Sequence, residues 1–378
     1  MKRTKIIRNI VISVSALSAL TRLVTAGTND GVTNFNDTPL VHRHPYRHST
    51  FTTFDVPGAG TGSDQGTFPG SINPAGVITG VYLDASNVFH GFLRGRDGTI
   101  TTFDVPGAGT GMFQGTEGGS INSGGAVTGF GRDASNVAHG FVRDEDGTIT
   151  TFDALGAGTG SDQGTFPGSI NPAGVITGFY TDASGVNHGF LRDEDGTITT
   201  FDAPGAGTEP FAGTFPLGIN PGGTITGDYT DASGTPHGFV RDEDGTITTF
   251  DAPDAVNGTF PVVAINPMGT ITGTYTDASF VNHGFVRARD GTFTTFDAPV
   301  AVNGTYPNNI NPAGVIAGQY FDQSFASHGF LRDRDGSITA VDVPGSASTA
   351  VLGINPEGRI TGFYTDASGV AHGFLRTR

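Results

Sequence analysis

An internal repeat constrains the fold of this chain more than any other feature of its 378 residues. The tripeptide His-Gly-Phe occurs seven times, at intervals of 49, 49, 49, 46, 45 and 44 residues. Around most copies recur Ile-Asn-Pro-x-Gly, Ile-Thr-Gly, Asp-Ala-Ser and Thr-Thr-Phe-Asp, in a fixed order. Seven similar units, numbered 1 to 7 below, therefore fill residues 50–378, as expected of a chain built from stacked supersecondary units.

Each unit contains four apolar-rich stretches separated by short turns that contain Gly. In unit 3, which contains His188, these stretches are residues 165–171, 175–182, 186–193 and 197–203. Turns of this kind join antiparallel strands, and 60 Gly, 21 Pro and no Trp favour strands and turns over helices. We therefore predict an all-β fold, a seven-bladed β-propeller with four antiparallel strands per blade.

The turns also predict the register between strands. If Asp182 pairs with Val186 and Asp193 pairs with Thr197, large residues face glycines in unit 3. The predicted pairs are Gly178 with Phe190, Gly189 with Phe179 and Phe201, Tyr180 with His188, and His188 with Asp202. A ring opposite each glycine covers bare backbone, which favours this register over a shift by one residue.

The two ends of the repeat region complement each other. The region begins with a lone fourth strand at residues 51–55. Its last unit stops after the third strand, at residues 376–378, and so lacks a fourth strand. Pairing between these ends would leave no open sheet edge. We therefore predict that the N-terminal strand joins the last blade and closes the ring.

Residues 1–26 differ from the repeats. Four basic residues among the first eight precede an apolar run at residues 10–14, and the segment ends in Val24-Thr25-Ala26. This pattern predicts a secretory signal peptide cleaved after Ala26, and a mature protein that is secreted, periplasmic or at the cell surface. A retained membrane anchor is the alternative, although the apolar stretch is short and is followed by Arg22.

Residues 27–49 are predicted to form a flexible leader before the propeller. They contain His42, His44 and His48, and neutral imidazoles suit transition metals. Because no carboxylate or thiolate supports these side chains, we interpret them as incidental and predict no metal site.

Charge and composition exclude several classes of partner. The formal net charge is −16, and removal of residues 1–26 would change it to about −21. Such a chain repels nucleic acid and anionic membrane surfaces. It has no Cys, phosphate-binding loop, dinucleotide fingerprint, His-Glu-x-x-His motif or nucleophile elbow, so we predict no cofactor. We expect a monomer.

The run Ile-Asn-Pro-Ala-Gly-Val-Ile-Thr-Gly, followed by His-Gly-Phe-Leu-Arg and a Gly turn, resembles the HAF-repeat family of extracellular bacterial proteins. The resemblance covers nearly all of residues 50–378. The chain departs from the family in having Pro in most of its first turns, and His-Gly-Phe where the family name implies His-Ala-Phe. The resemblance implies export and a repeat fold, and it supplies no substrate or catalytic residue.

A His and an Asp recur 14 residues apart, and a Tyr lies opposite each His in the predicted register, except in unit 2, which has Gly131. The pairs are His90–Asp104, His139–Asp153, His188–Asp202, His237–Asp251, His283–Asp297 and His328–Asp342, with Asp55 as the predicted partner of His372. Such rows suit acid–base catalysis or metal binding. Because a reaction needs one asymmetric site whereas every blade needs the same brace, we interpret them as buried structural rows.

The connections between units break the symmetry. The fourth-to-first and second-to-third connections are predicted to share one face, and the former are long and uneven in units 1 to 4. We select nine residues there as candidates for ligand binding: Asp64, Gln65, Met112, Phe113, Glu117, Asp162, Gln163, Glu209 and Phe211. Neutral variation of surface loops is the alternative.

Acidic turns occur at residues 144–147, 193–196 and 242–245, and clustered carboxylates suit Ca²⁺. These turns are shorter than an EF-hand loop, and the equivalent turns at 95–98 and 288–291 lack two of the three acids. We therefore interpret them as hairpin turns.

These features predict an exported, non-catalytic binding or interaction scaffold for an extracellular glycan, peptide or protein. A carbohydrate-active propeller enzyme, a lyase or a hydrolase, is the first alternative. For hydrolysis it would need two carboxylates about 5 to 10 Å apart in one cleft. A structural or adhesion protein of the cell surface is the second.

Overall fold

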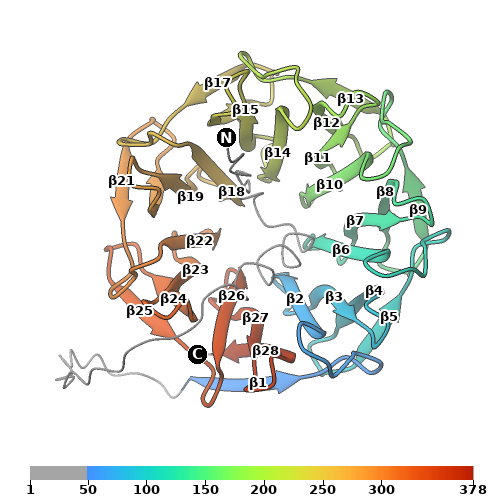
Figure 1. Ribbon diagram of the computed structural model, residues 1–378, viewed down its shortest axis with the longest axis vertical. Helices are drawn as coiled ribbons and strands as arrows, with labels where there is room; N and C mark the ends of the chain where they lie inside the picture. The colour runs from blue at the N-terminus through green and yellow to red at the C-terminus, as the bar shows by residue number, and fades with distance from the viewer. Residues whose placement is uncertain (1–48, 378) are drawn as a thin grey trace, which may run out of the picture.

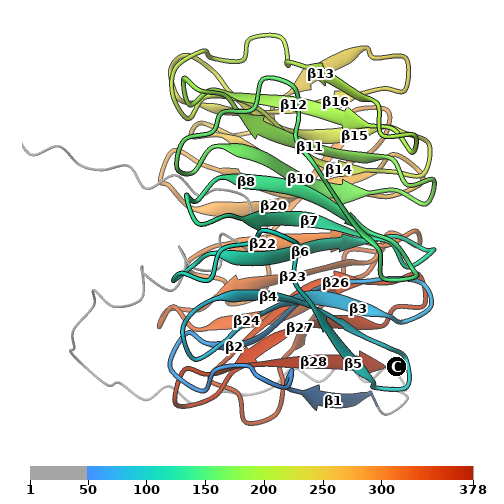
Figure 2. The ribbon, with the colours of Figure 1, turned by 90° about the vertical axis from the view of Figure 1, so that its right-hand side faces the viewer.

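The computed structural model describes residues 49–377, which contain 28 strands and no helix. The predicted signal peptide and all but the last residue of the predicted leader lie outside the described residues. The strands form antiparallel units that follow one another around a ring (Figure 1), and they run between the two faces of that ring (Figure 2). The molecule thus has a propeller-like all-β fold, as predicted at that level.

The first strand of each unit lies nearest the centre of the ring, and the fourth lies at the outside (Figure 1). The first strands are β2 (Gly66–Ile72), β6 (Gly115–Ile121), β10 (Gly164–Ile170), β14 (Gly213–Ile219), β18 (Thr259–Ile265), β22 (Thr305–Ile310) and β26 (Ser348–Ile354). The second strands are β3 (Ile78–Leu83), β7 (Val127–Arg132), β11 (Ile176–Thr181), β15 (Ile225–Thr230), β19 (Ile271–Thr276), β23 (Ile316–Phe321) and β27 (Ile360–Thr365).

The two outer strands of each unit follow. The third strands are β4 (Phe89–Arg94), β8 (Ala138–Arg143), β12 (Asn187–Arg192), β16 (Pro236–Arg241), β20 (Asn282–Arg287), β24 (Ser327–Arg332) and β28 (Ala371–Thr377). The fourth strands are β5 (Ile100–Phe103), β9 (Ile149–Phe152), β13 (Ile198–Phe201), β17 (Ile247–Phe250), β21 (Phe293–Phe296) and β25 (Ile338–Val341). The fourth-strand position of unit 7 is taken by β1 (Thr50–Phe54), which pairs antiparallel with β28.

The strand pairings of unit 3 confirm the predicted register. Gly178 faces Phe190, and Tyr180 faces His188. Gly189 faces Phe201 on its other side. The observed strands differ from the predicted ranges by one or two residues at their ends.

Glycine in the His-Gly-Phe motif allows neighbouring units to pack closely. A Cβ atom on Gly189 would lie 2.9 Å from the Phe201 ring and 2.8 Å from Pro216 of unit 4. Such contacts are too short, so a side chain at this position would force the sheets apart. The motif therefore marks a point of close approach as well as a strand.

Phenylalanine in the same motif forms the core between units. These rings are fully buried: Phe92, Phe141, Phe190, Phe239, Phe285, Phe330 and Phe374. The Phe190 ring contacts Phe152 of unit 2 edge-on, with centroids 6.0 Å apart. The Arg192 guanidinium lies 4.9 Å from the centroid of the same Phe152 ring. Six of the seven outer strands thus cover the core of the next unit with one aromatic ring, and β25 of unit 6 has Val341 at this position.

Asparagine in the Ile-Asn-Pro motif links the units near their first turns. Its Oδ1 accepts hydrogen bonds within its own turn, as Asn171 does from Val175 N at 3.0 Å. Its Nδ2 donates to the carbonyl of the equivalent Asn in the next unit. Five such bonds, 3.2 to 3.5 Å long, are Asn73–Asn122, Asn122–Asn171, Asn266–Asn311, Asn311–Asn355 and Asn355–Asn73. The last bond joins unit 7 to unit 1 across 282 positions of sequence.

The N-terminal strand lies where its sequence predicted. In the pairing of β1 with β28, Phe54 faces Gly373 and Phe51 faces Arg376. Asp55 lies 2.8 Å from Nδ1 of His372, which is the predicted partner. No helix able to span a membrane occurs between residues 49 and 377.

Candidate functional site on one face of the ring

The fourth-to-first and second-to-third connections lie together, as predicted, on a face that we name the loop face. The amide of Asp162, in the connection of unit 3, donates to the carbonyl of Asn136 in the turn of unit 2 at 3.0 Å. Within unit 3, Gln163 Nε2 donates to Ala183 O at 3.2 Å. The remaining turns form the opposite face, which we name the hairpin face.

Several of the nine candidate residues hold the loops together. Gln65 Oε1 accepts a hydrogen bond from Gly62 N at 2.9 Å, and its Nε2 donates to Asn87 Oδ1 at 3.0 Å. Gln163 is placed in the same way, accepting from Gly160 N at 2.8 Å. The carbonyl of Glu209 accepts from Ala212 N at 2.9 Å and closes its loop.

Other candidates occupy left-handed backbone positions at the tips of the connections. These are Asp64, Phe113, Asp162 and Phe211, with φ between 61° and 70°. The Phe113 ring lies 6.3 Å from that of Phe89, centroid to centroid. Phe211 is 72% exposed and Met112 is 64% exposed.

The His rows follow the loop face around the ring. In each unit His Nδ1 lies 2.8 to 3.1 Å from the Asp that follows the fourth strand. The ring stacks on Tyr in six units, with centroids 4.8 to 5.2 Å apart. A second Asp, from the second-to-third turn, faces Nε2 at 3.4 to 3.7 Å. These second acids are Asp84, Asp133, Asp182, Asp231, Asp277, Asp322 and Asp366.

The prediction that these rows are buried was wrong. The His side chains are 21 to 37% exposed, and the first Asp of each row is 41 to 58% exposed. The rows lie at strand ends, where no neighbouring sheet covers them. The recurring Asp-Ala-Ser turn, six residues before each His, was the sequence signal for the second acid. Desolvation lowers the pKa of His328, but its contacts with Asp342 and Asp322 outweigh this, so its pKa is raised.

Unit 2 lacks the Tyr of this row. Gly131 faces His139, whose side chain is 37% exposed. A Cβ built on Gly156 of unit 3 would contact Tyr180 at 3.5 Å, whereas one built on the equivalent Gly107 has no atom within 4 Å. The ring that contacts this glycine in unit 3 is thus absent from unit 2, although the equivalent Gly345 of unit 7, whose row has Tyr364, also has no atom within 4 Å.

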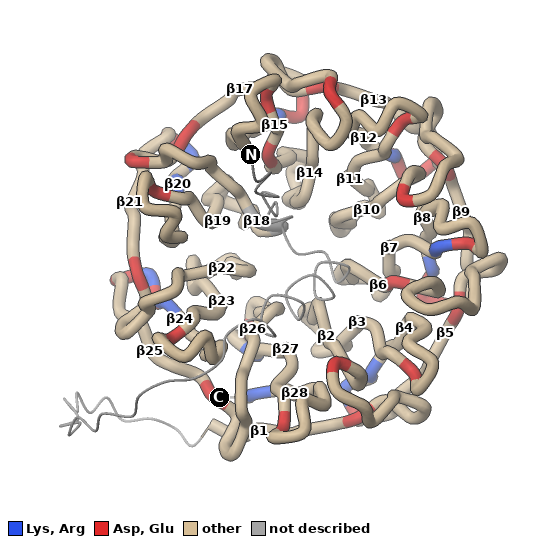
Figure 3. Tube along the Cα trace, viewed as in Figure 1, with Lys and Arg blue, Asp and Glu red and all other residues tan. Residues whose placement is uncertain are grey.

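Charged residues are rare in the two inner strands of every unit. Glu117 is the single charged residue of the first strands, and Arg132 and Asp228 are the two of the second strands, among the described residues. Figure 3 shows acidic colour on β6, between the uncharged first strands β2 and β10. Glu117 was assigned to a rim loop from the sequence, which was wrong, because the connection ends at Gly115, with φ of 109°, where β6 begins.

Glu117 and Arg132 form an ion pair that extends to unit 3. Arg132 Nε donates to Glu117 Oε1 at 3.4 Å, and its Nη1 donates to Asp162 Oδ1 at 3.4 Å. The guanidinium lies 5.4 Å from the Phe130 centroid and 5.7 Å from that of Phe166. The structure thus brings together two of the nine candidates, Glu117 and Asp162, through an arginine that sequence reasoning missed.

Glu117 is only 3% exposed, and its Oε2 has no hydrogen-bond partner. Burial raises the pKa of this carboxyl to about 7, against the opposing effect of Arg132. A buried acceptor without a donor costs free energy. Unit 2 therefore carries an unsatisfied polar group where unit 3 has Phe166.

Aromatic rings surround this position. Phe166 stacks on Phe179 with centroids 5.0 Å apart, Phe130 meets Phe166 edge-on at 5.1 Å, and Phe179 meets Phe215 at 5.1 Å. These rings connect units 2, 3 and 4. In unit 4 the residue facing Phe215 is Asp228, which is 6% exposed.

Asp228 was also missed from the sequence. Burial raises the pKa of its carboxyl to about 8. The signal was the segment Ile-Thr-Gly-Asp-Tyr, in which Asp replaces the Phe of unit 3. The inner strands of units 2, 3 and 4 thus combine stacked rings with two buried carboxyls and one guanidinium.

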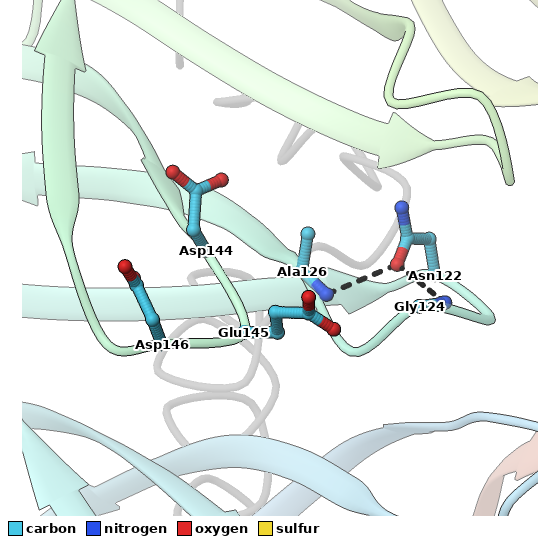
Figure 4. A pocket seen from close by; sticks show the side chains of 6 residues that line it. All are labelled: Asn122, Gly124, Ala126, Asp144, Glu145 and Asp146. Atoms are coloured by element: carbon cyan, nitrogen blue, oxygen red, sulfur yellow. Dashed lines mark hydrogen bonds between the residues drawn. The ribbon is translucent and has the colours of Figure 1, made fainter.

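The hairpin face carries a cavity of about 410 Å³ in unit 2, lined by Asn122, Gly124, Ala126, Asp144, Glu145 and Asp146 (Figure 4). Asp146 Oδ1 accepts a hydrogen bond from Thr148 N at 2.8 Å, which lowers the pKa of its carboxyl. Figure 4 shows Glu145 extending toward Gly124, away from Asp144 and Asp146. Between residues 49 and 377, no three His, Cys, Asp or Glu side chains are grouped to hold a metal ion. This geometry is that of a hairpin turn.

Solved structures resemble the fold, whereas no protein-family model and no curated protein matches the chain. Virginiamycin B lyase from Staphylococcus aureus is 17% identical with a TM-score of 0.54, covering 88% of this chain and 100% of that one. A streptogramin B lyase is 16% identical with a TM-score of 0.56, covering 86% and 97%. A fucose-specific lectin from Aleuria aurantia is 12% identical with a TM-score of 0.45, covering 73% and 95%. The similarity to the lyases shows the fold alone.

Proposed function

We propose that this protein is an exported, non-catalytic binding scaffold, built as a closed seven-bladed β-propeller of the HAF-repeat type. Seven sequence repeats, the pairing of β1 with β28 and the bond from Asn355 to Asn73 support seven blades in a closed ring. The basic and apolar segment at residues 1–26 supports export.

The observation that carries a binding role is Glu117. It is buried on an innermost strand with a free acceptor oxygen, in a position that packs an aromatic ring in unit 3. The pair with Arg132 contributes little to stability, because desolvation of both charges offsets their attraction. A feature that breaks the local packing rules in one repeat of seven is expected to serve a site.

We propose that the ligand is a small polar molecule with hydroxyl groups, such as a glycan fragment, bound on the loop face of units 2 and 3. The Glu117 carboxylate would accept from a hydroxyl, and Arg132 would donate to ligand oxygens. The half-buried rings of Phe166 and Phe179 would pack against an apolar face of the ligand. Asp162, which is 79% exposed, would release Arg132 at little cost.

An enzyme acting on extracellular carbohydrate is the second candidate. The observation in its favour is that burial places the pKa of Glu117 at about 7 and that of Asp228 at about 8, values suited to proton transfer near neutral pH. Turnover of a carbohydrate substrate distinguishes this enzyme from a binding scaffold.

A purely structural or adhesive cell-surface protein would show neither turnover nor specific binding.

A glycan array combined with a hydrolase and lyase screen tests these functions on the protein without residues 1–26. The matched control is Glu117→Phe with Arg132→Thr, which gives unit 2 the residues of unit 3 at both positions, Phe166 and Thr181. Specific binding that the double variant loses would support the scaffold. Turnover lost in the same variant would replace the scaffold with an enzyme, and binding unchanged by the variant, or no binding, would overturn the site.

A further inference from the structure

We propose a second contact surface, on the loop face of units 5 and 6, that binds a basic polypeptide carrying apolar side chains. It is independent of the ligand site in units 2 and 3. We name it the apolar patch and define it by Val256, Phe280, Val300, Val302 and Phe325. These side chains are 55 to 75% exposed.

The exposed apolar side chains are unevenly distributed. Nine large apolar side chains are exposed among the described residues, and five of them belong to the apolar patch. Val256, Val300 and Val302 lie in fourth-to-first connections, and Phe280 and Phe325 lie in second-to-third turns. Both kinds of connection belong to the loop face, so the five side chains gather on one side of two adjacent units. Concentrations of this kind mark contact surfaces.

Backbone hydrogen bonds hold these loops side by side. The amide of Asn257, next to Val256, donates to Thr276 O at 3.0 Å, near the turn of Phe280. The amide of Val302 donates to Phe321 O at 3.1 Å, near the turn of Phe325. Asn282 of unit 5 donates to the Tyr306 hydroxyl of unit 6 at 2.8 Å, which links the two units.

Three patch residues adopt a backbone conformation that their side chains disfavour. Phe280, Val300 and Phe325 have φ of 62° to 63°. The counterparts of the two Phe in other units are Gly or Asn, such as Asn87 and Gly185, and those of Val300 are Gly or Asp, such as Gly205 and Asp254. A bulky or β-branched residue in the left-handed region is destabilising, because its Cβ crowds the backbone. Burial offsets little of this cost, because the three side chains are 60 to 75% exposed, so a contact outside the fold is the consistent explanation.

Charge around the apolar patch selects the partner. The loops of units 5 and 6 on this face carry Asp254, Asp277, Asp297 and Asp322. The segments 251–260, 276–283, 297–305 and 321–328 contain no Lys or Arg. Carboxylates around an apolar centre repel nucleic acid, anionic lipid and a second copy of this acidic chain, and attract a basic polypeptide.

The test uses a synthetic amphipathic helix with one face of Leu and one of Lys, and measures its binding to the protein without residues 1–26 by fluorescence anisotropy. The variant Phe280→Asn with Phe325→Asn uses the residue of units 1 and 2 at these turns, Asn87 and Asn136, and leaves every charge in place. We expect it to weaken binding about tenfold or more. Asp254→Gly, which uses the residue of Gly205, should weaken binding several-fold and reduce its salt dependence.

The control is Met268→Ala, which removes an exposed apolar side chain from a hairpin-face turn and should leave binding unchanged. If the Asn double variant binds the helix as tightly as the wild type, the proposal is overturned, because the interaction would then depend on net charge alone. Equal binding of a Leu and Glu helix would overturn the choice of a basic partner. Concentration-dependent self-association that the double variant abolishes would replace the partner with a second copy.

Discussion

Unit 3 and its two neighbours have nearly the same sequence but differently constructed inner strands. In unit 3, Phe166 and Phe179 stack on each other. In unit 2 the first of these positions holds Glu117, and in unit 4 the second holds Asp228. The buried Phe of each His-Gly-Phe motif is the same in all three units. The comparison indicates that the buried Phe core between units defines the fold. The inner strands near the loop face, by contrast, tolerate buried carboxyls that lower stability.

The largest expected effect comes from Asp228→Thr, which gives unit 4 the residue of unit 5, Thr274. The folded pKa of Asp228 is about 8, against 3.8 for the ordinary carboxyl. Between these values unfolding releases a proton, so raising the pH from about 4 to about 8 destabilises the wild type. Because one pKa unit corresponds to about 1.4 kcal/mol, the wild type should lose about 5 kcal/mol more than the variant over this range.

Urea denaturation of both proteins at pH 4.5, 6, 7 and 8 measures this difference. Other titrating groups are common to the two proteins, so their contribution cancels. Parallel stability curves would show that Asp228 is ionised in the folded protein throughout, and the buried neutral carboxyl would be wrong.

Arg132→Ala in unit 2 should have the next largest effect. It leaves the buried Glu117 carboxylate without its cation, and breaking a buried pair in this way costs about 3–5 kcal/mol. Because the pKa of Glu117 is about 7, the loss should be greatest above pH 7 and smaller near pH 5, where the carboxyl is protonated. Thermal unfolding at both pH values measures it.

The control for Arg132→Ala is the double variant Glu117→Phe with Arg132→Thr, which removes both charges. It should be at least as stable as the wild type, as expected when apolar packing replaces a buried ion pair. A double variant as unstable as Arg132→Ala would mean that Arg132 acts through its contacts with Phe130 and Phe166.

Much of the fold could be predicted because one unit repeats seven times. Turn residues determined the register, and the observed pairs of Gly178, Gly189 and Tyr180 agree with it. The burial of the His rows could not be predicted in this way, because exposure at a strand end depends on what the next unit covers. Arg132 and Asp228 were missed because candidate residues were sought in the connections, whereas these two lie in strands, at positions where one unit differs from the others. The strand position of Glu117 was in fact implied by the alignment of unit 2 with unit 3.

The smallest effect concerns the same comparison at the outer strands. His188→Ala in unit 3 removes a contact to Asp202 at 3.0 Å and a stacked Tyr180, and should cost about 1 kcal/mol. His139→Ala in unit 2 removes the contact to Asp153 but no stacked ring, and should cost about half as much. Gly131→Tyr supplies the missing ring, because the space above Gly107 is open, although the Cβ of the new side chain would lie 3.1 Å from Val105. In the Gly131→Tyr background, His139→Ala should cost as much stability as His188→Ala, as measured by thermal unfolding. If the two His variants cost the same in the wild type, the Tyr contributes nothing to the row.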